Sequence, residues 1–99
     1  MIFTSWIESH QTLEKHPKLL KLISLTGWTK NETIGILHRL WWWTLAYAED
    51  GDLSKYSSTE VALMLDLNET FDKAKLFDIL KEAKFLDLDL KVHDWLDFA

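Results

Sequence analysis

Apolar residues recur every three or four positions over most of the chain, which is the spacing of one face of a helix. A helix is predicted over residues 17–25, because Pro17 suits a first helical position and Gly27 suits the residue that follows the last. Further along, Ser57 and Glu60 have the spacing of a capping box. They predict a short helix of about two turns immediately after Ser57.

The longest helical pattern runs from about residue 30 to residue 48, and Thr29 with Glu32 forms a capping box at its start. Its apolar residues form two stripes, Ile34, Leu37, Trp41, Leu45 and Ala48 on one and Ile36, Leu40, Trp43 and Tyr47 on the other. A helix that is apolar on nearly all sides is predicted to be buried at the centre of the fold. Gly35 inside it predicts the close approach of another backbone.

Three consecutive tryptophans, Trp41–Trp43, lie within this helix. Successive helical residues are ~100° apart, so the three rings cover about 200° and one packing surface cannot bury them all. Trp42 lies between the two stripes, whereas Trp6 and Trp95 near the chain ends are expected to cover the helix. Trp42, Trp6 and Trp95 are the candidate protein-interface residues. Base stacking is the alternative, but it needs a basic groove and Arg39 is the only adjacent cation.

The second half of the chain predicts one more long helix and a β-hairpin with a very tight turn. The helix begins at Asn68 or Thr70 and ends near Lys84, and residues 86–93 then alternate between apolar and polar side chains. Leu53 is expected to supply a third strand. A short helix, a turn, a longer helix and a hairpin make a winged helix-turn-helix, so the fold class expected is mainly α with a small antiparallel β-sheet.

Composition narrows the class of protein. The 99 residues predict one domain, 1–99, and their 47% apolar content predicts a folded core. There is no cysteine, no signal peptide and no uncharged apolar run near the ~20 residues that span a bilayer, so a cytoplasmic protein without membrane contact is expected. The four histidines match no metal spacing, and no catalytic motif is present. We therefore expect no metal, no cofactor, no small-molecule substrate and no enzymatic activity.

The charge pattern argues against strong autonomous DNA binding. The net charge is −5, and only residues 1–48 carry an excess of positive charge, of +2. Residues 49–54 carry −3, residues 55–86 carry −1 and residues 87–99 carry −3. A duplex-DNA binder usually shows a basic face, which here could only be a local patch.

Several short motifs occur in an order that resembles a known family. They are Trp6-Ile7, His16-Pro17-Lys18, the long helix that ends in Asp50-Gly51-Asp52-Leu53-Ser54, and the closing Val92-His93-Asp94-Trp95. Together they resemble the N-terminal winged-helix domain of phage replisome organisers and related primosome (DnaD-type) replication-initiation proteins. The resemblance implies a role in DNA replication, through DNA binding, self-association or both. It also implies that residues 1–99 are the N-terminal domain of a longer replication protein or a shortened relative.

The chain departs from a DNA-reading member of that family in its expected recognition helix. Residues 71–84 contain no Arg, Asn or Gln, the side chains that pair bidentately with guanine or adenine. The candidate phosphate contacts are six lysines: Lys73, Lys75, Lys81, Lys84, Lys18 and Lys21. Acidic residues interleave with those of the helix, and Asp87 and Asp89 make the expected hairpin a poor wing for a DNA groove.

The preferred function is therefore a phage-type replication-initiation module that associates with replication proteins, with itself, or with both. Its DNA contact is expected to be weak and mainly non-specific. Two alternatives stay open at this point. One is a winged-helix transcription regulator that binds duplex DNA, and the other is an oligomerisation domain with no nucleic-acid role.

Overall fold

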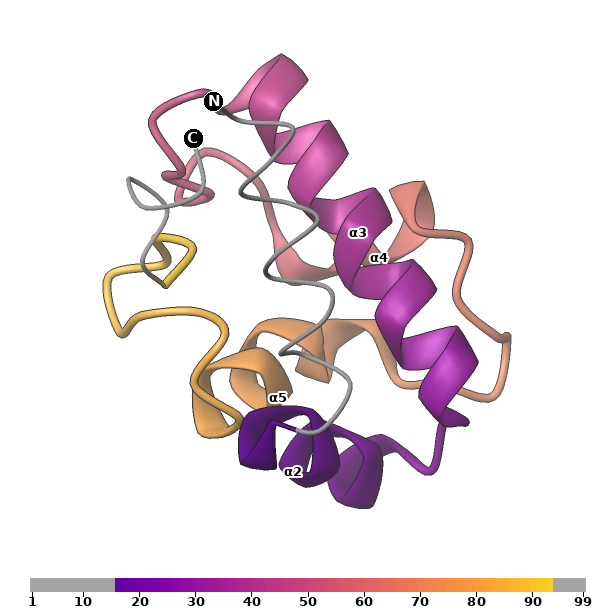
Figure 1. Ribbon diagram of the computed structural model, residues 1–99. Helices are drawn as coiled ribbons and strands as arrows, with labels where there is room; N and C mark the ends of the chain where they lie inside the picture. The colour runs from indigo at the N-terminus through magenta and orange to yellow at the C-terminus, as the bar shows by residue number, and fades with distance from the viewer. Residues whose placement is uncertain (1–15, 94–99) are drawn as a thin grey trace.

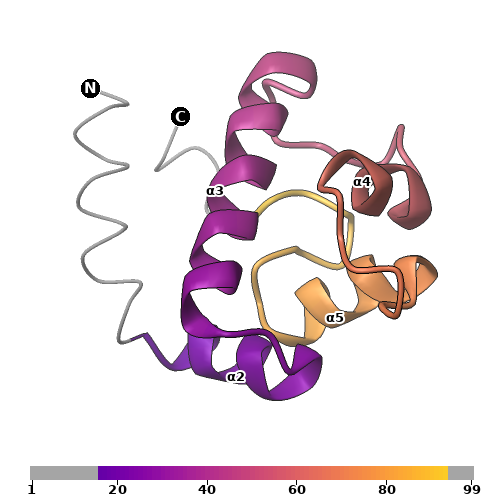
Figure 2. The same ribbon diagram turned by 90° about the vertical axis from the view of Figure 1, so that its right-hand side faces the viewer.

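A computed structural model describes residues 16–93, in which four α-helices and one 3₁₀ turn surround a common core (Figure 1). The elements are, in chain order, α2 (Pro17–Thr26), α3 (Lys30–Tyr47), α4 (Ser58–Met64), η1 (Lys73–Lys75) and α5 (Leu76–Glu82). α2 packs beside α3 and α5, and α4 packs against η1 and α5. Figure 2 shows α3 along one side of these residues, with α4 and α5 on the other.

The predicted start and stop signals of α2 are confirmed. The His16 side chain accepts a hydrogen bond from the Lys18 backbone N–H at 3.1 Å, and Pro17 is the first helical residue. At the other end Gly27 has a φ of 77°, and its N–H donates to the Ile23 carbonyl at 2.8 Å. Glycine adopts this left-handed conformation without the steric strain of a side chain.

Both predicted capping boxes are also present. At the start of α3 the Glu32 N–H donates to Thr29 Oγ1 and the Thr29 N–H donates to Glu32 Oε1, each at 3.1 Å. Ser57 and Glu60 make the same two bonds at 3.0 Å before α4. Because each box satisfies two N–H groups that lack helical partners, short local signals set where these helices begin.

The core forms against one side of α3. This side buries Thr33, Leu37, Leu40, Trp41 and Thr44. Facing residues of the same cluster come from α2, α4, α5 and the segment after α5: Leu19, Leu22, Val61, Leu76, Leu80, Leu86 and Val92. The two threonines donate their hydroxyl hydrogens to carbonyls of the preceding turn, Thr44 to Leu40 at 2.7 Å and Thr33 to Thr29 at 2.8 Å. Their burial therefore leaves no hydroxyl unsatisfied.

The prediction that α3 is buried on nearly all sides is wrong. Trp42, on the side away from the core, is 59% exposed, and Tyr47, the last residue of the helix, is 67% exposed. The apolar stripes overstate burial because aromatic residues count as apolar wherever they point, while the core formed by residues 16–93 lies against one side of the helix.

The predicted long helix from Asn68 or Thr70 to Lys84 is also wrong. Asn68 Oδ1 accepts a hydrogen bond from the Thr70 N–H at 3.0 Å, which closes a turn. Asp72 Oδ1 then accepts from the Ala74 N–H at 3.2 Å and caps η1, so α5 itself spans only 7 residues. Short polar side chains bonded in this way offer the backbone an alternative to the helical ladder.

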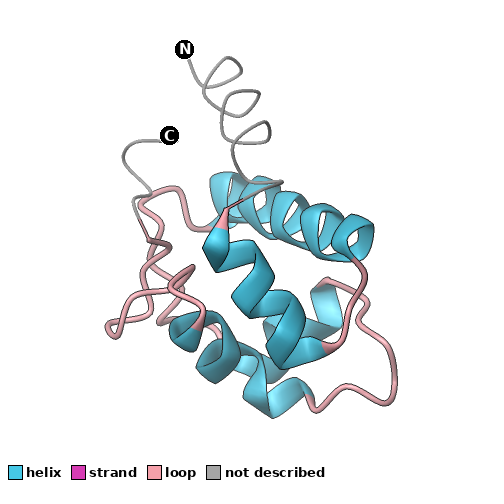
Figure 3. Cartoon of the chain, turned by 60° about the horizontal axis from the view of Figure 1, so that its bottom comes forward, coloured by secondary structure: helices cyan, strands magenta, loops and turns pink. Residues whose placement is uncertain are grey.

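The expected β-sheet, and with it the winged-helix fold class, is not found in residues 16–93. Figure 3 draws helices and loops there and no strand. The segments that were expected to form strands, around Leu53 and over residues 86–93, make only two isolated antiparallel bridges, Leu86 with Val92 and Asp52 with Lys91. The tight turn predicted within residues 86–93 is present, since the Leu90 N–H donates to the Asp87 carbonyl at 2.9 Å, but the residues that flank it form isolated bridges and no strand. Leu88 lies on this turn and is 91% exposed.

Asp52 secures the loop that receives this turn. Its Oδ1 accepts a hydrogen bond from the Ser54 backbone N–H at 2.9 Å. This bond is the main cause of a lowered Asp52 pKa, followed by a hydrogen bond from the Ser54 hydroxyl and the charges of Lys91 and Lys55. The ordinary value is 3.8, so the carboxylate form is favoured by folding.

Asp52→Asn is expected to lower the denaturation midpoint at neutral pH. A carboxylate whose folded pKa is depressed stabilises the protein above its unfolded pKa, and this contribution disappears as pH falls through the folded pKa. Urea titrations at about pH 7 and about pH 2.5 should therefore show a gap between variant and parent that closes at the lower pH. A gap of equal size at both values would contradict this account.

A hydroxyl from α4 caps α5. The residue before α5, Lys75, makes no side-chain cap bond. Ser58 Oγ instead accepts a hydrogen bond from the Phe77 N–H at 3.0 Å and donates its own hydrogen to the Lys73 carbonyl at 2.8 Å. One part-buried hydroxyl thereby joins the first turn of α4 to η1 and α5.

Ser58→Ala should lower the free energy of unfolding by about 1–3 kcal/mol, because the Phe77 N–H loses its partner in a part-buried place, whereas the Lys73 carbonyl keeps the Leu76 N–H. Ser24→Ala is the matched control, since that hydroxyl donates to the Lys21 carbonyl in an exposed position. The control is expected to change stability by no more than about 0.5 kcal/mol. Equal effects in chemical denaturation would refute a capping role for Ser58.

Candidate interaction surface

The three consecutive tryptophans of α3 have three different environments. Trp41 is 3% exposed and packs against the His38 ring, with ring centroids 5.2 Å apart. Trp43 is half-buried and meets the Tyr56 ring edge-on at 4.7 Å. Trp42 is 59% exposed, which confirms that one ring of the run lacks full cover. Trp6 and Trp95 lie outside the described residues, so their covering role stays a prediction.

Trp42 belongs to a straight row of exposed residues on α3. Gly35, Arg39, Trp42 and Ala46 are all exposed and follow one another at intervals of four, three and four residues. Such spacing places side chains on one seam of a helix. We call these four residues the outer stripe. It carries one charged residue, where the solvent side of an isolated surface helix normally carries several.

His38 supports the Trp42 ring from beside the outer stripe. The two ring centroids are 6.0 Å apart in an edge-to-face arrangement. His38 Nδ1 lies 2.8 Å from the Ile34 carbonyl oxygen, which fixes the orientation of the imidazole. An aromatic ring held in this way loses little side-chain entropy when it binds a partner.

Arg39 connects the outer stripe to the end of α4. Its Nη1 donates a hydrogen bond to the Leu65 carbonyl at 3.0 Å. Leu65 follows the last residue of α4, where helical carbonyls lack backbone partners and the helix dipole favours a cation. The bond therefore holds the guanidinium close to the α3 surface.

A groove runs beside the outer stripe between α3 and residues 65–72. It consists of two adjacent hollows of about 290 and 410 Å³, and Trp28, Glu32 and Asn68 line both. Gly35 and Arg39 line the smaller hollow, so the groove and the outer stripe form one continuous surface.

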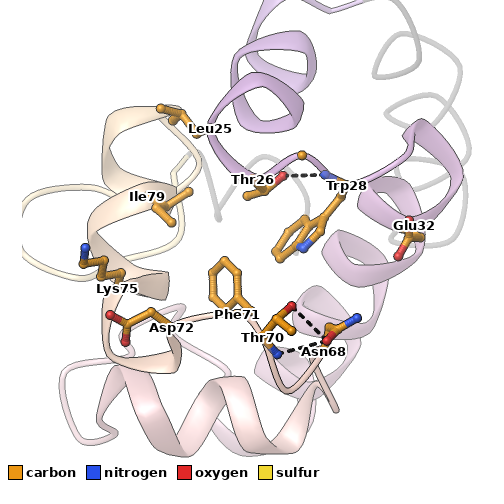
Figure 4. A pocket seen from close by; sticks show the side chains of 11 residues that line it. Leu25, Thr26, Trp28, Glu32, Asn68, Thr70, Phe71, Asp72, Lys75 and Ile79 are labelled. Atoms are coloured by element: carbon orange, nitrogen blue, oxygen red, sulfur yellow. Dashed lines mark hydrogen bonds between the residues drawn. The ribbon is translucent and has the colours of Figure 1, made fainter.

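The larger hollow is built around two aromatic rings. Figure 4 shows Trp28 and Phe71 pointing toward one another from different segments, and their centroids are 5.2 Å apart. Thr26 Oγ1 accepts a hydrogen bond from the Trp28 N–H at 3.2 Å, which positions the start of this wall. Asp72 and Lys75 lie at the rim. The hollow thus combines two aromatic rings with several polar side chains, a mixture that is suited to a side chain of a protein partner.

The apolar pattern of the sequence does not single out Trp28 or the Trp28–Phe71 pair. The two residues lie far apart along the chain, and no local periodicity connects them. Gly35 is the sequence feature that marks the groove, but a glycine inside a helix predicts internal packing. A Cβ built on Gly35 has no heavy atom within 4 Å, so the expected close approach of another backbone does not occur within the described structure.

The six candidate DNA-binding lysines fall into two groups. Lys18 and Lys21 lie on α2, which packs beside α5, and Lys18 Nζ is 5.7 Å from the Phe85 ring centroid, next to Lys84. Lys81 pairs with Asp78 at 3.5 Å. Lys73 and Lys75 lie in η1, immediately before α5. The length of α5, about 10 Å at the helical rise per residue, separates them from its C-terminal end.

Acidic residues provide no metal site in the part of the chain that the structure describes. No group of three or more His, Asp or Glu side chains there could hold an ion. His93 Nδ1 lies 2.7 Å from Asp87 Oδ1 and links the two sides of the last turn. Among the same residues, no helix has both the length and the apolar character needed to cross a bilayer.

Comparison of the chain with protein-family models, with curated proteins and with solved structures gives no match.

Gly35→Ala should raise the free energy of unfolding by about 0.5–1 kcal/mol in dilute solution. Alanine has the higher helix propensity, and the new methyl group meets open space. Thermal or urea denaturation at low protein concentration measures the change. A loss of stability instead would show that the position is crowded within the chain.

Proposed function

We propose that this chain is a protein-association module of a phage-type replication-initiation system, with DNA contact that is weak and mainly non-specific. The setting in replication rests on the resemblance of its short motifs to that family. The association rests on the surface of α3 and the groove beside it.

The observation that carries the proposal is the exposure of Trp42. A tryptophan that is 59% exposed, supported by His38 and placed on an almost uncharged stripe, leaves a large apolar area in water. Tryptophan and arginine are the residues most enriched where protein interfaces gain their energy. Arg39 lies next to Trp42 on the same stripe, and the groove offers an apolar recess for a further side chain.

Specific readout of duplex DNA is a weaker candidate for two reasons. α5 is only 7 residues long, and it contains no Arg, Asn or Gln to pair with base edges. Lys81 already pairs with Asp78. Lys18 and Lys21 of α2 can contact phosphates, but such contacts carry no sequence information.

Fluorescence anisotropy with random and sequence-enriched duplexes tests this division of roles. We expect equal affinity for the two kinds of duplex. That weak affinity should fall about tenfold between ~50 and ~200 mM salt, as for two phosphate contacts. The double variant Lys18→Ala, Lys21→Ala should reduce the signal, whereas Trp42→Ala should leave it unchanged.

Selective binding that persists at the higher salt concentration would overturn the proposal in favour of a sequence-reading protein. Loss of DNA binding on Trp42→Ala alone would point instead to base stacking by that ring.

A further inference from the structure

We propose that the partner of the outer stripe is a second copy of this chain, packed antiparallel along α3. This inference rests on the proposed association function and names its occupant. It derives from the order of the four stripe residues, Gly35, Arg39, Trp42 and Ala46.

The stripe is complementary to itself when one copy is reversed. Its intervals of four, three and four residues are symmetric about a point midway between Arg39 and Trp42. In an antiparallel pair of helices with this register, Arg39 faces Trp42 of the second copy, and Gly35 faces Ala46. Each contact occurs twice, as a two-fold axis requires. This is also the alternation by which seams of antiparallel helices interlock.

The central contact pairs a cation with an aromatic face. The guanidinium of Arg39 is held near the α3 surface by its bond to the Leu65 carbonyl. Trp42 of the second copy presents an exposed indole supported by His38. Guanidinium groups stack on indole faces, and tryptophan is the aromatic residue that attracts a cation best. In a parallel pair the two arginines would face each other instead, which like charges oppose.

The outer contact pairs two small residues. Glycine inside an exposed helix is unfavourable relative to alanine by ~1 kcal/mol, and the space above Gly35 is open. A second helix that approaches closely gives that space an occupant, and Ala46 is the smallest side chain that could lie opposite. Small residues at the ends leave room for the large Trp42 and Arg39 side chains between them.

The groove gains an occupant from the same register. The C-terminal end of α3 in one copy lies over the N-terminal half of α3 in the other, where the groove opens beside Gly35. Tyr47, at the end of α3, is 67% exposed. The last turn of α3 in the second copy therefore lies beside the groove, next to the contact between Gly35 and Ala46.

Sedimentation velocity of the intact chain, from about 10 µM to about 1 mM, measures the association. We expect a monomer–dimer equilibrium. Trp42→Ala should raise the dissociation constant at least about tenfold, as loss of a central aromatic residue does. Leu63→Ala is the matched control, because Leu63 on α4 is 61% exposed and lies off the stripe. It should leave the constant unchanged.

Gly35→Ala separates this interface from fold stability. The variant is expected to be the more stable monomer and the weaker dimer, since the methyl group occupies the space that the second helix needs. A variant that dimerises as well as the parent chain would contradict close approach at this position.

Disulfide trapping tests the register, and the chain has no cysteine of its own to interfere. A mixture of Gly35→Cys and Ala46→Cys chains should form a mixed disulfide under mild oxidation. Each variant alone should not, because its two sulfurs would lie about 16 Å apart, far beyond the reach of a disulfide. Leu88→Cys, on the exposed turn after α5, measures cross-linking by random encounter.

The outcomes divide cleanly. Cross-linking of Gly35→Cys with itself, above the Leu88→Cys level, would overturn the antiparallel register. A chain that stays monomeric at every concentration, or an equal effect of Trp42→Ala and Leu63→Ala, would overturn the second copy as the partner. Neither result changes the DNA-binding measurement above, so failure of this inference is distinguishable from failure of the proposed function.

Discussion

The rest of the structure depends on the burial of one side of α3. Leu37, Leu40 and Trp41 on this side join a single apolar cluster with residues from α2, α4, α5 and the segment that follows α5. Burial of such side chains stabilises a fold by roughly 25 cal/mol per Å² of apolar surface removed from water. The short elements of the second half pack against one another and against α2, and their apolar residues join this side of α3 in the same cluster.

The same geometry explains why a surface suited to association exists. Eighteen residues of helix carry more aromatic area than one buried side can cover, and the excess emerges at Trp42 and Tyr47. Arg39 crosses from this exposed side to the end of α4. The bond brings residues 65–68 close to α3, and the smaller hollow of the groove lies between them. Core, groove and outer stripe are thus consequences of one helix.

The second half of the chain shows how polar side chains can redirect a pattern. The apolar spacing after Asn68 is compatible with a long helix, yet Asn68 and Asp72 bond to nearby N–H groups and close turns instead. The alternation of Leu86, Leu88 and Leu90 predicts a hairpin with a tight turn, and the turn forms from Asp87 to Leu90, but its flanks make isolated bridges and no strand. In both places the local hydrogen bonds compete with the regular ladder, and the apolar pattern does not register that competition. The basic residues are consequently distributed over α2, η1 and α5, without a long recognition helix to present them.

The sequence alone places the starts of α2, α3 and α4. Pro17 and the two capping boxes are local signals, each of which involves residues no more than three positions apart. The sequence also determined that one of three adjacent tryptophans would lack cover, since the helical angle between neighbours is constant. It singles out Trp42 as this ring, because this residue lies between the two apolar stripes. Packing between distant segments decides that Gly35 meets open space and that Trp28 and Phe71 form one wall of a groove. Those features depend on which distant segments pack against each side of a helix, and no periodicity within a single segment contains that information.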